Sequence, residues 1–321
     1  MPRRNQSSAF HRVLVGCDGS PEASDAVALG AALAMLCNAG LTLVGVYAYP
    51  LFPMPESWSG AARERETEAI LRRERDARAR NAHIVAERDS SVPRALRRVA
   101  RRERADLVVL GSASRAQEGR TEPGPHARQL LHNAPGAAVV APRGYHEQPA
   151  TLQRIAVGYD GGDEAKAALR IAAALAQAAG ARALIHEVVD NRVPLGLNIV
   201  VDAITGRVVD WEALMSHEQN QARRRVQEAA ESVSVAVDGT VSVGDPGAEL
   251  RKLSDEVDLI VLGSLHLARR ERLGIGATAE SVLDGAACPV LVVPRPLAGE
   301  LEPSLPRKRN RRSPRPAESV A

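Results

Sequence analysis

Short apolar runs alternate along the chain with longer segments whose apolar residues recur at helical spacing, a pattern typical of α/β proteins. The apolar runs predict strands at residues 12–17, 41–47, 83–86, 106–110 and 138–141, and again at 154–159, 183–189, 233–243, 258–262 and 290–293. The segments between them predict helices at 21–37, 63–80, 93–104 and 126–133, and then at 163–178, 211–231, 248–256 and 278–285. This order predicts an α/β fold of parallel, doubly wound sheets with right-handed crossovers.

The pattern occurs twice. The run ADLVVLGS has a close copy, VDLIVLGS, 152 positions further along the chain. The first strands of the two copies each lead to an aspartate, Asp18 and Asp160, and these lie only 142 positions apart. The second copy therefore contains about ten further residues, which we place in a small hairpin within 191–210. Such an internal duplication predicts two domains, at residues 10–144 and 152–296.

Composition narrows the class of protein. Of the 321 residues, 45% are hydrophobic and only 2% aromatic, so the cores must be packed from Ala, Val, Leu and Ile. The cysteines Cys17, Cys37 and Cys288 lie in or beside apolar runs and are expected to be buried thiols. No apolar run approaches the ~20 residues of a membrane span, and the four before Cys17 are too few for an export signal. We expect a cytoplasmic protein that makes no membrane contact.

The last quarter of each copy contains the most informative motif. In the second copy, Gly263 and Gly276 flank a loop that enters a helix at Ala277 and Thr278. Together with the aspartate after each first strand, the ending CPVLVVP and the tandem arrangement, this loop resembles the universal stress protein family over nearly the whole chain. The resemblance implies two Rossmann-like, adenine nucleotide alpha hydrolase-like units. In nucleotide-binding members, two glycines with two residues between them, followed by nine residues and Gly-Ser or Gly-Thr, surround the phosphates at a helix N-terminus.

The second copy keeps part of that motif. His266 stands in place of the middle glycine and Ala277 in place of the hydroxyl residue, with Thr278 one position further on. The resemblance therefore implies a degenerate nucleotide site in the second domain, where any bound cofactor, ATP or AMP, is expected. The candidate binding residues are Asp160, Gly263, His266, Gly276, Ala277 and Thr278. A structural interpretation stays open, in which the aspartate and glycines only form turns and His266 only covers the loop.

The first copy departs further from the motif. Its candidate residues Asp18, Gly111 and Gly124 keep their places, but Ser114 replaces the middle glycine and Pro125 the hydroxyl residue. Proline supplies neither an N–H nor a hydroxyl group, and two acidic residues in the loop would repel phosphate. We expect this copy to lack a working phosphate site.

The resemblance implies a non-catalytic protein of stress response and regulation. No Gly-x-Gly-x-x-Gly follows the first strand, and neither a Walker loop, a spaced nucleophile–base–acid set nor clustered metal ligands occur. We therefore expect no enzyme and no metal site. One alternative is a sensor that binds ATP or AMP through the second domain. Another is an ATP hydrolase, which turnover lost on Asp160→Ala would support.

Basic residues raise a further alternative. The net charge is only +3, but six arginines load the helix predicted at 93–104, whose Leu96 and Val99 would face the sheet. Residues 297–321, rich in Pro and Arg, are expected to form a disordered tail, which could bind nucleic acid or another polyanion. The lack of interleaved aromatic residues favours a solubilising tail instead.

The family resemblance also implies self-association, because family members dimerise through their last strands. Pairing of the two copies within one chain would place residues 138–141 beside residues 290–293. The expected architecture is thus two tandem, parallel, five-stranded sheets that form an internal pseudo-dimer.

Overall fold

The computed structural model describes residues 8–48, 60–132, 134–192, 211–264 and 275–294. Nearly all of the segment expected to form a hairpin, the loop containing His266, and the tail expected at 297–321 lie outside the described residues.

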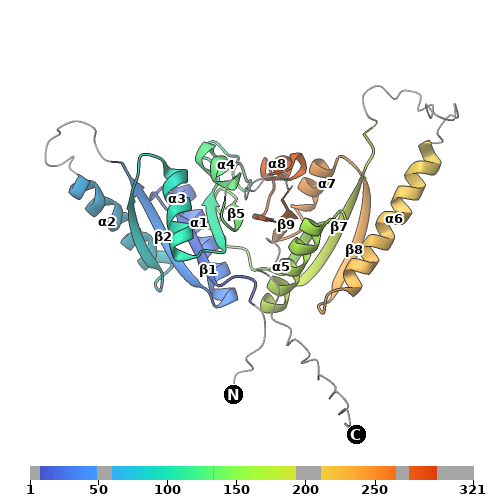
Figure 1. Ribbon diagram of the computed structural model, residues 1–321, viewed down its shortest axis with the longest axis horizontal. Coiled ribbons are helices and arrows are strands. Elements are labelled where there is room, and N and C mark those ends of the chain that lie inside the picture. Colours follow the sequence, from blue (N-terminus) through green and yellow to red (C-terminus); the bar gives the residue numbers. More distant parts are fainter. Residues whose placement is uncertain (1–7, 49–59, 133, 193–210, 265–274, 295–321) are drawn as a thin grey trace, which may run out of the picture.

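Within the described residues, ten strands form one continuous sheet (Figure 1). The first half supplies β1 (Arg12–Gly16), β2 (Gly40–Tyr47), β3 (His83–Arg88), β4 (Leu107–Gly111) and β5 (Ala137–Ala141). The second half supplies β6 (Arg154–Gly158), β7 (Arg182–Asp190), β8 (Val237–Gly244), β9 (Leu259–Gly263) and β10 (Val290–Val293). The order across the sheet is β3-β2-β1-β4-β5-β10-β9-β6-β7-β8, so the second half repeats the first in mirror order.

The two halves meet at their last strands, as the sequence predicts. β5 and β10 pair antiparallel, with Val139 opposite Leu291, whereas the other pairings among these ten strands are parallel. Both of these side chains are fully buried, so a hydrophobic seam holds the halves together. The predicted pseudo-dimer is confirmed, with its two five-stranded sheets merged into one.

Helices cover both faces of this sheet (Figure 1). One face carries α1 (Pro21–Cys37), α2 (Gly60–Arg78), α5 (Asp163–Ala179) and α6 (Trp211–Glu231). The other carries α3 (Val92–Glu103), α4 (Pro125–Leu131), α7 (Pro246–Leu253) and α8 (Ala277–Leu283). Successive strand residues point to opposite faces, so Val13 and Val15 join one buried cluster and Leu14 the other. None of the described helices is long and apolar enough to cross a membrane.

Local start signals fix where α1 and α7 begin. Ser20 and Asp245 cap α1 and α7, and each side chain accepts the backbone N–H three residues on, at 3.1 and 2.8 Å. A proline follows each cap, so α7 begins two residues before its predicted start. The strand predicted at 233–243 begins only at Val237, because the two valines before it pack against the core from a bend after α6.

A buried carboxylate holds the segment after β5 against α1. Asp25 is only 1% exposed and accepts the backbone N–H groups of Gly144 and His146 at 2.9 and 2.8 Å. The ring Nδ1 of His146 lies 2.5 Å from the same carboxylate. A buried charge is tolerated when hydrogen-bond donors surround it, and here they come from the chain that leads out of the first half.

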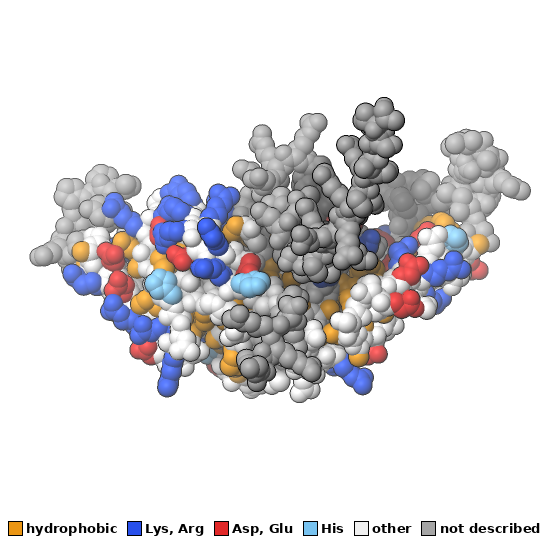
Figure 2. Space-filling model, turned by 60° about the horizontal axis from the view of Figure 1, so that its bottom comes forward, with side chains coloured by type: hydrophobic (Ala, Val, Ile, Leu, Met, Phe, Trp, Pro, Cys, Tyr) orange, Lys and Arg blue, Asp and Glu red, His pale blue; other side chains and the backbone are white. Residues whose placement is uncertain are grey.

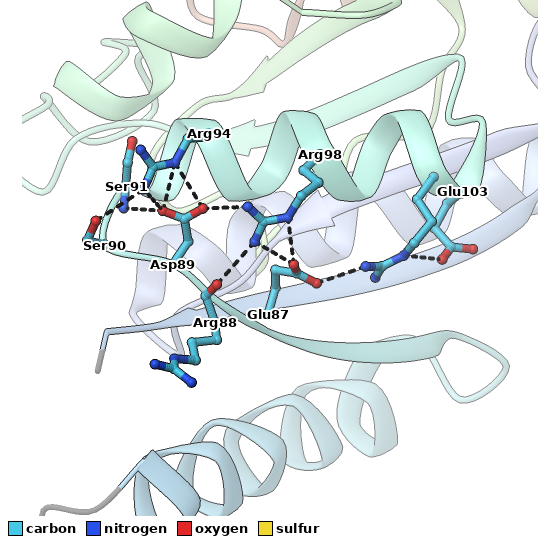
Figure 3. Close-up of polar contacts among 9 residues, drawn as sticks. Glu87, Arg88, Asp89, Ser90, Ser91, Arg94, Arg98 and Glu103 are labelled. Carbon is cyan, nitrogen blue, oxygen red and sulfur yellow. Dashed lines mark hydrogen bonds and ion pairs between the residues drawn. The ribbon is translucent and has the colours of Figure 1, made fainter. Parts of the chain in front are cut away.

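Carboxylates at the end of β3 anchor α3, which helps to position one wall of the site. Asp89 accepts hydrogen bonds from Arg94 at 3.0 Å and from Arg98 at 2.7 Å (Figure 3). Glu87 accepts from Arg98 at 2.6 Å and from Arg102 at 3.0 Å. Hydrogen bonds from Arg94 hold the pKa of Asp89 well below its usual range, because they favour the charged form.

This lowered pKa predicts a loss of stability in acid. A carboxylate whose folded pKa is lowered stabilises the fold above its unfolded pKa of about 4, and this contribution disappears as the pH falls below that value. Asp89→Asn is therefore expected to lower the free energy of unfolding near pH 7 and to reduce its fall between about pH 5 and pH 2. Urea denaturation over a pH series measures both effects.

The matched control is Asp76→Asn, which removes an exposed carboxylate that pairs with the neighbouring Arg75 at 2.9 Å. Exposed pairs contribute little, so this change is expected to leave the pH profile nearly unaltered. Identical profiles for the two variants would contradict the assignment to Asp89.

Candidate functional site

A cleft of about 240 Å³ lies at the carboxyl ends of β1 and β4 in the first half. Its larger apolar residues come from β2, β4 and α3, and are Val44, Val46, Val92, Leu96 and Leu110. Its polar side chains are those of Asp18, Ser20, Glu22, Ser112 and His126. All three first-copy candidates (Asp18, Gly111 and Gly124) line it, at the edge of the sheet where parallel α/β proteins bind small molecules.

Asp18 presents one engaged and one available carboxylate oxygen. Its Oδ1 accepts the backbone N–H of Ser20 at 3.0 Å and the Ser20 hydroxyl at 2.6 Å. No described residue donates a hydrogen bond to Oδ2. The turn therefore fixes the carboxylate while leaving an acceptor for the hydroxyl group of a ligand.

The two glycines of the first copy have different roles. A Cβ on Gly111 would lie 2.1 Å from the carbonyl oxygen of Glu22, so glycine is required where α1 approaches the end of β4. Gly124 precedes α4 with φ −68°, and the nearest atom to an added Cβ is the Cβ of Ala113 at 3.7 Å. The close approach gives Gly111 a structural role, whereas Gly124 has no such constraint.

The loop between these glycines is folded onto itself. The Ser112 hydroxyl donates to the carbonyl of Ala141 at 2.7 Å and accepts the N–H of Glu122 at 3.1 Å. The N–H of Ala113 donates to the carbonyl of Glu122 at 2.7 Å. Pro125 begins α4 and has no N–H to donate. These contacts use donors that would otherwise be available to a phosphate.

The same loop also bridges the two halves. Thr121 is buried and donates its N–H to the carbonyl of Ala286 at 2.8 Å. Arg120 pairs with Asp255 at 2.9 Å, so an ion pair also joins this loop to the second half. Sequence analysis missed this role, because the partners belong to the other copy and no local pattern indicates them.

In the second half, the strand ends repeat this arrangement. The Oδ1 of Asp160, after β6, accepts the N–H of Gly162 at 2.8 Å. A Cβ on Gly263, the last residue of β9, would lie 2.6 Å from the backbone carbonyl carbon of Glu164 in α5. Gly263 therefore allows the same close approach of helix and strand as Gly111.

The start of α8 keeps donors that α4 lacks. Gly276 is its N-cap, and Ala277 and Thr278 are its first two residues. Neither is proline, and the first N–H groups of a helix have no acceptor within the helix. His266, the remaining candidate of this copy, lies outside the described residues.

A histidine that sequence analysis overlooked marks a chemical difference between the halves. In the register of the two half-sheets, His186 on β7 occupies the position that Val44, a cleft-lining residue, has on β2. Its ring nitrogens lie 2.7 Å from Thr240 Oγ1 and 3.0 Å from Ser242 Oγ. Burial lowers the pKa of His186, which favours the neutral ring at neutral pH. Only the strand register reveals the equivalence.

The cysteines are buried and free, as the sequence predicts. Burial raises the pKa of Cys17, which lines the cleft, to about 11, so its thiol is protonated near pH 7. Among the described residues, no group of three or more His, Cys, Asp or Glu side chains is placed to hold a metal ion.

The fold and cleft together define a class of protein: a tandem α/β chain whose two Rossmann-like units pair through their last strands. The family model described as "Universal stress protein family" matches residues 9–142 and 151–294. The chain therefore belongs to the universal stress protein family and contains two family units in tandem, as its motifs predict.

Individual relatives agree with this assignment. A universal stress protein of Mycobacterium tuberculosis is 27% identical over 300 residues, which cover 88% of this chain and 96% of the relative. One from Methanocaldococcus jannaschii is 34% identical over 91 residues, 27% of this chain and 54% of that protein. The solved structure of a universal stress protein from Archaeoglobus fulgidus covers 90% of this chain and 99% of its own, with 17% identity and a TM-score of 0.61.

Proposed function

We propose that this chain is a non-catalytic regulatory protein of the stress response whose first unit binds the nucleoside part of an adenine nucleotide. One observation carries the proposal: Asp18, Gly111 and Gly124, singled out by the family motif, converge on one cleft with an apolar wall.

The lining of the cleft suits a flat heteroaromatic ring joined to a sugar. Val44, Val46 and Leu96 offer an apolar surface against which a base can pack. Asp18 Oδ2 offers an acceptor for a ribose hydroxyl, and the Ser20 contacts fix its direction. The volume of about 240 Å³ lies below the ~300–1,000 Å³ of most small-molecule sites, which favours a nucleoside over a triphosphate.

The surroundings of Gly111 and Gly124 disfavour several phosphates. The Glu22 side chain lines the cleft and would repel an anion. Pro125 removes one donor at the start of α4, and the Ser112–Glu122 contacts use others. We propose that the first unit prefers adenosine or AMP to ATP.

The second unit is the alternative site for ATP or AMP, and the first turn of α8, which contains no proline, supports it. Ala277 and Thr278 supply N–H groups, and Thr278 adds a hydroxyl, where the first unit has Pro125 and His126. Asp160 would serve the ribose there, as Asp18 does in the first unit. The His186 ring on the neighbouring strand would make the base-facing wall more polar than the Val44 wall.

Val46→Arg tests the site in the first unit. The half-buried Val46 lines the cleft, so an arginine there is expected to fill the space and to weaken adenosine and AMP binding at least tenfold. Titration calorimetry with adenosine, AMP and ATP measures the change. The matched control is Val188→Arg, because Val188 has the same register position on β7 and is also half-buried.

The three outcomes of this comparison are distinct. Binding lost in Val46→Arg and retained in Val188→Arg supports the proposal. The reverse result assigns binding to the second unit, and a further loss in Gly276→Val would locate it at α8. An absence of binding of all three compounds at millimolar concentration overturns nucleotide recognition by either unit.

The absence of catalysis is part of the proposal, and the serine contacts support it. Ser20 Oγ caps α1 and donates to Asp18, while Ser112 Oγ donates to the Ala141 carbonyl. Both serine hydroxyls of the cleft thus make hydrogen bonds that stabilise the backbone or the Asp18 turn. Release of ADP from ATP that disappears on Asp160→Ala would contradict this part of the proposal.

A further inference from the structure

The exposed side of α3 concentrates positive charge. Six arginines belong to this helix and its C-cap, and three carboxylates pair with them. The arginines are Arg94, Arg97, Arg98, Arg101, Arg102 and Arg104, and we call them the α3 face. The excess of three positive charges here equals the net charge of the whole 321-residue chain. Figure 2 shows Lys and Arg side chains gathered over the half of the molecule that carries α3, with acidic side chains between them.

The acidic partners orient one row of this face while leaving it accessible. Arg94, Arg98 and Arg102 recur every four residues, about 6 Å apart along the helix. The carboxylates of Asp89 and Glu87 hold them in place (Figure 3). Their side chains nevertheless remain 59%, 46% and 50% exposed. The row is therefore ordered before any partner arrives, which reduces the entropy lost on binding.

The remaining arginines of the α3 face have no carboxylate partner within the described parts of the chain. Arg97, Arg101 and Arg104 make no ion pair with any described residue. Arg104 has φ +53°, in the left-handed region that favours glycine or asparagine after a helix. An arginine therefore occupies a C-cap position whose backbone conformation favours glycine or asparagine.

The fold itself does not require these arginines. α7 is the counterpart of α3 in the second unit, because Leu96 and Leu250 both pack against the glycine that ends the first strand of their unit. The sequence of α7, PGAELRKL, has two basic residues, and one of them pairs with Glu249. Among the described residues, the counterpart helix α7 therefore carries no such basic surface.

The chemistry of the α3 face points to one kind of partner. The apolar residues of the helix, among them Leu96 and Val99, are buried against the sheet, so the exposed face offers guanidinium groups without an apolar centre. A protein interface normally requires such a centre. A nucleic-acid backbone does not, because phosphates bind through charge and hydrogen bonds alone. We propose that the α3 face binds the phosphate backbone of nucleic acid without reading its bases.

Charge removal at the unpaired arginines tests this proposal. The full-length double variant Arg97→Gln/Arg101→Gln leaves the Asp89 and Glu87 contacts intact, so the fold is expected to persist. Fluorescence anisotropy with a labelled 20-base-pair duplex measures affinity over a salt series. The dissociation constant is expected to rise at least tenfold at low salt, and the slope of log K against log salt to fall by about 2.

Two control variants test whether the loss of nucleic-acid binding is specific to the α3 face. Arg223→Gln/Arg224→Gln removes two exposed arginines from α6 and is expected to leave both affinity and slope unchanged. Arg307→Gln/Lys308→Gln/Arg309→Gln removes three positive charges from the basic segment near the end of the chain. It is likewise expected to leave affinity and slope unchanged. If that triple variant loses binding while the α3 variant keeps it, the proposal is overturned. Equally tight binding of a labelled polyglutamate peptide that is lost in the α3 variant also overturns it, because the face would then bind any polyanion.

Discussion

Gly111→Ala is expected to destabilise the protein by about 3 kcal/mol, at the upper end of the range for overpacked sites. The new methyl group would lie 2.1 Å from the carbonyl oxygen of Glu22 and 2.7 Å from its carbonyl carbon. Both atoms belong to the backbone of α1, which cannot rotate away as a side chain can. The end of β4 and the start of α1 must therefore separate. Urea denaturation, followed by circular dichroism, measures the loss.

Gly124→Ala provides the control within the same candidate site. Its φ of −68° suits alanine, and the added methyl group would be in ordinary contact with Ala113 at 3.7 Å. We expect a loss of about 1 kcal/mol or less, because Gly124 is the N-cap of α4 and alanine is a poorer N-cap than glycine. Gly263→Ala should reproduce the large effect, because its methyl group would meet the backbone of Glu164 at 2.6 Å. Equal stability of all three variants would contradict the close-approach explanation.

Asp25→Ala is expected to lower the free energy of unfolding by about 3 kcal/mol. The change removes the acceptor of the Gly144 and His146 N–H groups and of the His146 ring. The site is nearly inaccessible to water, since Asp25 is 1% exposed, so solvent cannot replace these hydrogen bonds without opening the structure. Thermal and urea denaturation of the full chain measure the effect.

Two comparisons separate this effect from a general loss of charge. Asp25→Asn keeps one carbonyl acceptor and is expected to recover part of the stability. Asp106→Ala also removes a carboxylate that accepts two backbone N–H groups, those of His11 and Arg12 at 2.8 and 2.9 Å. Asp106 is 38% exposed, however, so water can substitute and we expect about 1 kcal/mol or less. Similar losses for Asp25→Ala and Asp106→Ala would show that burial is not the cause.

Most of the fold follows from local patterns in the sequence. Apolar runs predict the strands because parallel strands covered on both faces are almost entirely apolar. The pairing of β5 with β10 follows from the duplication together with the family resemblance. Helix ends are less well predicted: the periodicity places the start of α7 at 248, whereas the Asp245 cap and the proline after it start the helix at 246. The predicted start of β8 is wrong because partly buried valines need not belong to a strand.

The candidate site is only partly predictable. The spacing of Asp18, Gly111 and Gly124 correctly predicts that they lie together at one edge of the sheet, because the carboxyl ends of parallel strands meet there. The equivalence of His186 with the cleft-lining Val44 depends on strand register. The contact between Thr121 and Ala286 depends on how the halves pair. Both depend on residues far apart in the sequence, so no local sequence pattern predicts them.

The antiparallel seam between β5 and β10 has a consequence for dilution and for evolution. Two separate chains that paired in this way would dissociate as their concentration fell, whereas tethered partners meet at an effective concentration of about millimolar order. In a symmetric homodimer, moreover, every substitution alters both sites at once. A chain that encodes each half separately escapes that constraint. Val44 in the first half and His186 at the equivalent position of the second half can therefore be selected independently.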